Sequence, residues 1–190
     1  IMRKQAITLG RVGILLPIAA IIPFLGTLAG LAAMILLLFS HHYFSKFYQK
    51  PAIFNKALTG TIVMIAGNII GGAIFAAALF SSVGSVDGME DVNIQNMLSR
   101  VFDSGLTILG TVVMLAGAII GSYFLFQGLK VLAEETGMNH FRTAGLLYFI
   151  GTIASVILIG LLVFLVGWVF HIVAYFSIQP EEEASPESTQ

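Results

Sequence analysis

Apolar and polar positions are grouped in long blocks along this chain. Four apolar blocks, at residues 7–48, 56–82, 104–129 and 143–178, are separated by short stretches that carry most of the charge. A run of roughly 18 or more apolar residues is typical of a transmembrane helix, because about 20 residues are needed to cross the hydrocarbon core of a bilayer. The pattern therefore predicts an all-α fold, a polytopic transmembrane helical bundle with four to six membrane segments.

The first and last blocks are too long for a single crossing. As continuous helices they would measure about 60 Å and about 54 Å, roughly twice the thickness of the hydrocarbon core. Pro17 and Pro23 interrupt the first block, and Gly26 follows; proline removes a helical donor and clashes with the preceding turn. We predict breaks near residues 22–26 and near residue 160. Each block is then two short spans or a re-entrant hairpin, and four long spans with extramembrane extensions are the alternative.

The basic residues favour a first block that folds back. If it crosses once, the N-terminus and the loop at 83–103 carry four basic residues, and the opposite side carries five. If it returns, the N-terminus and the loops at 41–56 and 128–142 carry eight, against one for the acidic loop. Lys and Arg are enriched on the cytoplasmic side of membranes. The N-terminus and both basic loops are therefore predicted to be cytoplasmic, with residues 83–103 outside, and length favours a folded-back last block too.

Composition supports the same class of protein. The chain is 57% hydrophobic and 10% charged, whereas soluble domains carry about 25% charged residues. Residues 1–178 are predicted to form a single membrane-embedded helical domain. The last stretch, 179–190, is acidic and has too few apolar residues to offset the entropy of ordering. It is predicted to be a disordered tail.

A glycine-rich sequence occurs twice. Residues 60–71 read GTIVMIAGNIIG and residues 110–121 read GTVVMLAGAIIG. Small residues four apart leave two bare positions on one helix face, so a neighbouring backbone can approach closely in a bilayer. The two copies are predicted to run in opposite directions and to pack as neighbours. The predicted packing residues are Gly60, Gly67, Gly71, Gly110, Gly117 and Gly121.

Two polar residues stand out within the apolar blocks. Asn68 replaces the alanine of the second copy, Ala118, and would lie near the middle of the bilayer. Buried amides in membranes usually form hydrogen bonds between helices, and a ligand or ion site is the alternative. His171 lies between Trp168 and Tyr175, a spacing typical of an interfacial aromatic belt. A satisfied interfacial histidine is the favoured interpretation, and a functional one is the alternative.

No pattern in the sequence indicates catalysis. Without cysteine there is no thiolate nucleophile or thiolate metal site. The sequence has no phosphate-binding loop, zinc-protease signature or nucleophile elbow, and no carboxylate lies in the apolar blocks, where ion-coupled transporters usually keep one. We therefore predict no catalytic residues, no cofactor, no metal and no enzymatic activity.

Sequences in two polar loops resemble a known family. Residues 50–58 read KPAIFNKAL, residues 132–137 read LAEETG, and residues 141–148 read FRTAGLLY. These are similar to sequences of a family of small bacterial and archaeal membrane proteins known as domain of unknown function 996. The resemblance extends from about residue 10 to residue 178. It implies a polytopic prokaryotic membrane protein and assigns no role to any residue.

Together these patterns predict a non-enzymatic integral membrane protein that associates with itself or with a partner subunit through its helices. A small transporter or channel, with a path near Asn68, is the alternative hypothesis. The expected surroundings are the lipid bilayer of a prokaryotic plasma membrane, with a second copy or another membrane protein as partner and no nucleic acid.

Overall fold

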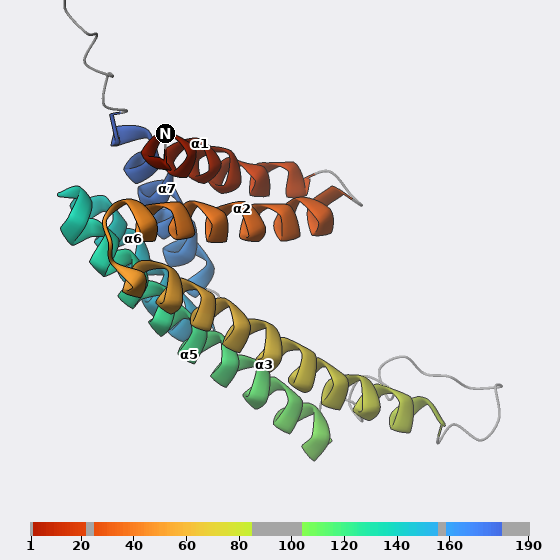
Figure 1. Cartoon of the computed structure of the whole chain (residues 1–190). Coiled ribbons are helices and arrows are strands. Elements are labelled where there is room, and N and C mark those ends of the chain that lie inside the picture. Colours follow the sequence, from red (N-terminus) through yellow and green to blue (C-terminus); the bar gives the residue numbers. More distant parts are fainter. Residues whose placement is uncertain (1, 22–24, 85–103, 156–158, 180–190) are drawn as a thin grey trace, which may run out of the picture. The chain divides into compact units, whose positions relative to one another are not determined.

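The structure is a computed structural model that describes residues 2–21, 25–84, 104–155 and 159–179. Within these ranges every regular element is helical, which confirms the all-α prediction (Figure 1). The elements are α1 (Met2–Leu15), a 3₁₀ helix η1 (Leu16–Ile21), α2 (Leu25–Phe47), α3 (Pro51–Gly84), α5 (Gly105–Thr136), α6 (Asn139–Ala154) and α7 (Ile159–Ser177).

Four stretches of helix are long and apolar enough to cross a membrane. They are Leu28–Phe47, Pro51–Ser81, Gly105–Thr136 and Ile159–Ser177. Large apolar side chains on these helices point outward, among them Leu28, Ile69 and Phe80. Lipid solvates such side chains as well as a protein core does, so helices can be apolar all round in a membrane. The prediction of a membrane-embedded helical bundle is confirmed in this form.

The described chain forms two compact units. Unit 1 consists of residues 1–58 together with 125–190, and unit 2 of residues 59–124. Unit 1 therefore holds α1, η1, α2, α6 and α7 with the start of α3 and the end of α5, while unit 2 holds the rest of α3 and α5. The single domain predicted for residues 1–178 stays a prediction, as does the tail, of which all but Gln179 lies outside the described residues.

The first apolar block folds back, as the basic residues predict. α1 ends at Leu15, Pro17 lies in η1, and α2 begins at Leu25. Residues 22–24 of the predicted break lie outside the described residues. α1 and α2 then lie side by side in opposite directions (Figure 1). The Ser40 hydroxyl donates a hydrogen bond to the carbonyl of Ala6 at 2.7 Å. This contact fixes the end of α2 beside the beginning of α1.

The last apolar block is also a helical hairpin. α6 ends at Ala154 and α7 begins at Ile159, so two separate helices form this block, with Gly160 in the first turn of α7. Residues 156–158, beside the predicted break, lie outside the described residues. A β-carbon built on Gly151 would lie 3.1 Å from the carbonyl oxygen of Gly160, and one on Gly167 would lie 3.3 Å from that of Ala144. Glycines on both helices therefore let α6 and α7 approach closely.

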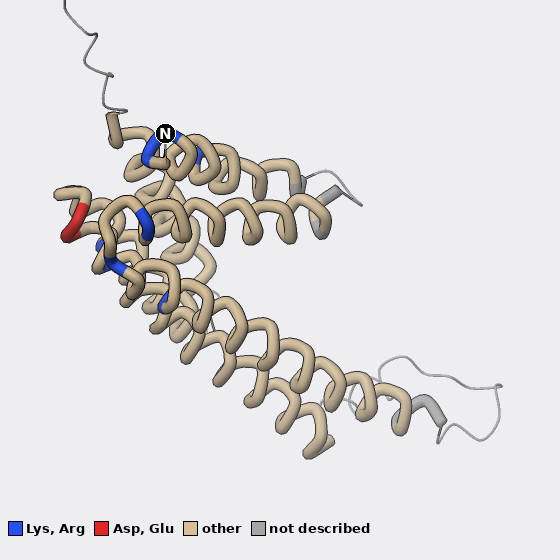
Figure 2. Tube along the Cα trace, in the orientation of Figure 1, with Lys and Arg blue, Asp and Glu red and all other residues tan. Residues whose placement is uncertain are grey.

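All described Lys and Arg residues belong to unit 1 and gather at one end of its helices (Figure 2). This end is formed by the start of α1, the end of α2, the start of α3, the end of α5 and the start of α6. An ion pair of 3.3 Å joins Lys50 to Glu135 there. The hairpins explain this gathering, because folding back returns each basic stretch to the same end. Of the predicted loop at 83–103, residues 83 and 84 belong to α3, and residues 85–103 lie outside the described residues.

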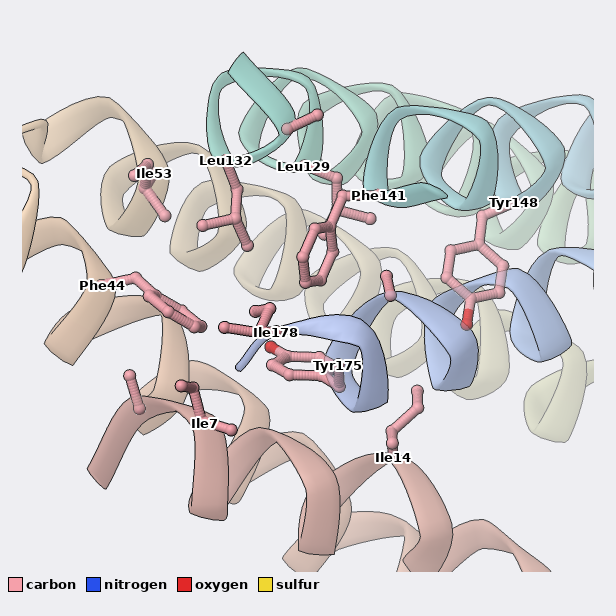
Figure 3. Packing of buried hydrophobic residues seen from close by; sticks show 13 residues of the cluster. Ile7, Ile14, Phe44, Ile53, Leu129, Leu132, Phe141, Tyr148, Tyr175 and Ile178 are labelled. Carbon is pink, nitrogen blue, oxygen red and sulfur yellow. The ribbon is translucent and has the colours of Figure 1, made fainter. Parts of the chain in front are cut away.

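Unit 1 has a core built around Tyr175. Its ring lies between Phe44 of α2, at 6.3 Å between ring centres, and Phe141 of α6, at 5.2 Å (Figure 3). On α1, Gly10 faces the same ring so closely that a β-carbon there would overlap it. Four helices thus meet at one tyrosine, and buried polar side chains lie next to it.

Candidate functional site

The repeated glycine sequences meet each other in unit 2. α3 and α5 run in opposite directions there, and a β-carbon built on Gly67 would lie only 2.7 Å from the Cα atom of Gly117. The reverse distance, from a β-carbon on Gly117 to the Cα atom of Gly67, is also 2.7 Å. The two backbones therefore touch at these positions, with no room for a side chain on either helix.

The contact is nearly two-fold symmetric. A β-carbon on Gly71 would lie 2.6 Å from the carbonyl oxygen of Gly110, and one on Gly121 would lie 2.6 Å from that of Gly60. Each of these two positions is also covered by a methionine of the opposite copy, Met114 or Met64. The start of one copy thus packs on the end of the other, and the structure brings all six glycines to one seam.

Asn68 does not lie in this seam. Its side chain is exposed, and its Nδ2 donates to the carbonyl of Met64, one turn earlier in the same helix, at 2.8 Å. One turn later, Gly72 has no atom within 4 Å of the position that a β-carbon would take. α3 therefore presents an amide and a bare glycine side by side on an outward face of unit 2.

His171 lies in the core of unit 1, with 2% of its surface exposed. The Tyr148 hydroxyl and His171 Nδ1 share a hydrogen bond of 3.2 Å that joins α6 to α7. The imidazole stacks on Tyr175 at 5.2 Å between ring centres, and the edges of Phe141 and Tyr148 close the pocket around it. The residue is thus a buried link between helices.

A second buried histidine extends this polar cluster to α2. His41 is 2% exposed, and its Nδ1 donates to the carbonyl of Leu37 at 2.6 Å. Next to it, the Ser40 hydroxyl hydrogen-bonds with the Tyr175 hydroxyl at 3.0 Å. The Nε2 atoms of His41 and His171 are buried and have no hydrogen-bond partner within the described residues. Neither His41 nor Ser40 is among the candidate residues that the sequence predicts.

Within the described residues this cluster consists of imidazoles and hydroxyls whose hydrogen bonds run between helices. In the part of the chain that the structure describes, no three His, Asp or Glu side chains are grouped to hold a metal ion. The hydrogen bonds of the polar cluster join α2, α6 and α7.

The His171–Tyr148 pair is open to a direct test. Tyr148→Phe removes one partner and is expected to cost about 0.6–2 kcal/mol, the range for hydrogen bonds between membrane helices. His171→Phe is expected to cost a similar amount, and the double variant less than the sum, because the same bond is lost only once. Unfolding of the native protein, the two single variants and the double variant by titration with denaturing detergent measures the coupling energy between the two residues. Strictly additive effects would show that the pair contributes nothing.

α1 is attached to the end of α7 by Arg11. Its guanidinium donates to the carbonyls of Tyr175 at 3.1 Å, of Ile178 at 2.9 Å and of Phe176 at 3.4 Å. A second link runs the other way, from Trp168 Nε1 to the carbonyl of Ile14 at 3.0 Å. These four hydrogen bonds hold α1 against α7, the helix that carries His171 and Tyr175.

Comparison with known proteins agrees with the resemblance seen in the polar loops. A family described as "Protein of unknown function (DUF996)" matches residues 29–169. The chain belongs to this family. It is also 29% identical over 181 residues to an uncharacterized protein of the archaeon Methanocaldococcus jannaschii, and the match covers 92% of each chain. No solved structure matches the chain. The family description assigns no activity to its members.

Proposed function

We propose that this member of the family is a non-enzymatic integral membrane protein that associates with a second copy or a partner subunit through an exposed helix face. Asn68 carries this proposal. It is a polar amide in the middle of a helix of 34 residues whose surroundings are otherwise apolar, and it faces outward from unit 2.

The physical argument rests on what an amide needs in lipid. A carboxamide has two donor hydrogens and an acceptor oxygen, and one bond to Met64 leaves most of this capacity unused. Hydrocarbon offers no partners, so a polar group from another helix stabilises the side chain by about 0.6–2 kcal/mol. The bare Gly72 on the same face lets another helix approach closely. An outward amide beside a glycine therefore favours association.

Within the chain, the six glycines have a different role in this proposal. They set the spacing of α3 and α5, and the seam they form is already occupied. The close approach at Gly67 and Gly117 argues against a solute path between these two helices, which weakens the transporter hypothesis. Association through the Asn68 face needs no such path.

The proposal places the protein in the plasma membrane of a prokaryotic cell, with the basic end of unit 1 on the cytoplasmic side. Two observations support it: the gathering of Lys and Arg at one helix end (Figure 2), since such residues are enriched inside, and the archaeal relative. Residues 83–103 would then be outside. A cysteine introduced at Ser85 should be labelled from outside in intact cells, and one at Ser45 should not.

Replacing Asn68 by leucine is expected to weaken self-association. Loss of an interhelical hydrogen bond of about 0.6–2 kcal/mol raises the dissociation constant about 3- to 30-fold. Native mass spectrometry in mild detergent, over a series of protein concentrations, measures this constant. Asn55→Leu is the matched control, because Asn55 is an exposed asparagine at the start of the same helix, where headgroups and water can solvate it. Equal constants for both variants, or a native protein that is monomeric and carries no partner subunit from the membrane, would contradict the proposal.

A further inference from the structure

A partly open groove of about 370 Å³ lies in unit 1 between the end of α2 and the start of α3. Four positions of α2 and two of α3 line it. They are Ile35, Leu38, Phe39, His42, Phe54 and Leu58. The groove is large enough for a small ligand or part of a larger one, and its walls are hydrocarbon apart from the imidazole.

The groove has a polar end and an apolar end. The chain reverses between α2 and α3 (Figure 1), so His42 and Phe54 lie near the turn while Ile35 and Leu58 lie farther from it. The rings of His42 and Phe54 meet edge to face at 4.9 Å. From Ile35 to His42 the helix advances about 10 Å. The groove thus runs from the basic end of unit 1 into the apolar part of the helices.

Positive charge lies at the polar end. Lys46 is exposed and follows His42 by four residues, which places both on the same face of α2. Lys50, at the turn, is half exposed and pairs with Glu135. Residues 41–56 contain Lys46, Lys50 and Lys56 but no Asp or Glu. An excess of positive charge therefore adjoins a slot lined with hydrocarbon.

We propose that this groove holds one hydrocarbon chain of an anionic membrane phospholipid, whose phosphate is bound at Lys46. The slot matches a lipid chain because it is apolar and lies along a helix that is long and apolar enough to cross a membrane. Lysine at the membrane surface attracts anionic headgroups and binds phosphate as a point charge. The charged end of the groove thus matches the lipid headgroup, and the apolar end matches the hydrocarbon chain.

Native mass spectrometry of the full-length protein with added lipid tests this. The probes are phosphatidylglycerol and phosphatidylcholine with identical chains, so that only the headgroup charge differs. One phosphatidylglycerol is expected to bind more tightly than phosphatidylcholine. Lys46→Gln is expected to weaken phosphatidylglycerol binding about fivefold, the effect of one lysine near a charged headgroup, and to leave phosphatidylcholine unchanged. Lys4→Gln, at the same end of unit 1 but outside the groove, should change neither.

A second pair of variants tests the slot itself. Leu38→Trp fills the groove and is expected to remove the bound lipid, whereas Leu31→Trp makes the same change at an exposed position of α2 that does not line it. A photoreactive phenylalanine analogue at residue 38 should cross-link to lipid. Because Lys46 is on the surface, its variant remains informative even if Leu38→Trp fails to fold.

Three results would overturn the proposal. Equal binding of the two lipids by the native protein would exclude recognition of the anionic headgroup. Equal loss of lipid in Leu31→Trp and Leu38→Trp would place the lipid elsewhere. A cross-link from residue 38 to a second copy of the chain, or to detergent alone, would assign the groove to another occupant.

Discussion

Replacing Gly67 by alanine is expected to push α3 away from α5 and to destabilise unit 2 by about 1–3 kcal/mol, the usual cost of overpacking a closely packed contact. The new β-carbon would lie 2.7 Å from the Cα atom of Gly117. That atom belongs to a helix backbone and cannot move aside as a side chain could. Titration of the protein with denaturing detergent, followed by the circular dichroism of its helices, measures the loss.

Gly72→Ala is the control for this experiment. Gly72 lies five residues later in the same helix and has open space within 4 Å of the β-carbon position. In the monomeric protein, where no partner covers the outward face of Gly72, the two variants add the same methyl group to the same helix and share the helix propensity of alanine. Any difference between them then reports the seam. Gly117→Ala should behave like Gly67→Ala. Indistinguishable unfolding of the Gly67 and Gly72 variants would show that the seam does not stabilise the protein.

The glycine seam shows how much of this fold the sequence could predict. The two copies have the same spacing, and antiparallel neighbours with that spacing place Gly60 opposite Gly121 and Gly71 opposite Gly110. Hydrophobic block lengths and the proline positions likewise indicated where the first block breaks, and the basic residues indicated that it folds back. These features can be predicted from local sequence, because each depends on residue type and spacing along one helix or block.

The buried polar cluster could not be predicted in the same way. His41 follows Ser40 and precedes His42 and Tyr43 in a polar and aromatic stretch between two apolar blocks. His41 is nevertheless buried, and the neighbouring Ser40 is bonded to Ala6 of α1 and Tyr175 of α7. These contacts join residues 34 and 135 positions apart. No periodicity within α2 carries that information.

For Asn68, the position in the helix was predictable from the sequence but the direction of its side chain was not. The sequence places it correctly in the middle of an apolar helix, near the glycine face. A helix turn covers 360° in about 3.6 residues, so the neighbour of a seam residue points about 100° away. Gly67 lies in the seam, and Asn68 consequently does not. The sequence thus predicts a polar amide within an apolar helix. Which way its side chain points follows only from the packing of α5 against α3.

Arg11 caps the C-terminal end of α7. In the sequence it served only as one of the basic residues that indicate orientation in the membrane. The last carbonyls of an α-helix have no intrahelical donors, and the helix end carries partial negative charge. Arg11 of α1 supplies donors to the carbonyls of Tyr175 and Ile178, beside the core of unit 1, and its guanidinium lies over the Phe176 ring at 5.1 Å. One cation thereby connects the first helix to the last.

Arg11→Met is therefore expected to destabilise unit 1 by about 1.5–3 kcal/mol, the range for hydrogen bonds with a charged group. Methionine keeps an apolar stem against the helices but leaves the carbonyls without their donor. The fluorescence of Trp168, the single tryptophan of the chain, reports unfolding because its indole is bonded to Ile14 of α1.

The matched control is Arg142→Met, which removes an exposed arginine of α6 from the same end of unit 1. A purely electrostatic role at the membrane surface would give both variants the same unfolding midpoint. If the guanidinium caps the last carbonyls of α7, only Arg11→Met lowers the unfolding midpoint relative to the native protein. Arg11→Lys should recover only part of the loss, because an ammonium group retains the charge but cannot reproduce the planar fork that reaches several carbonyls at once.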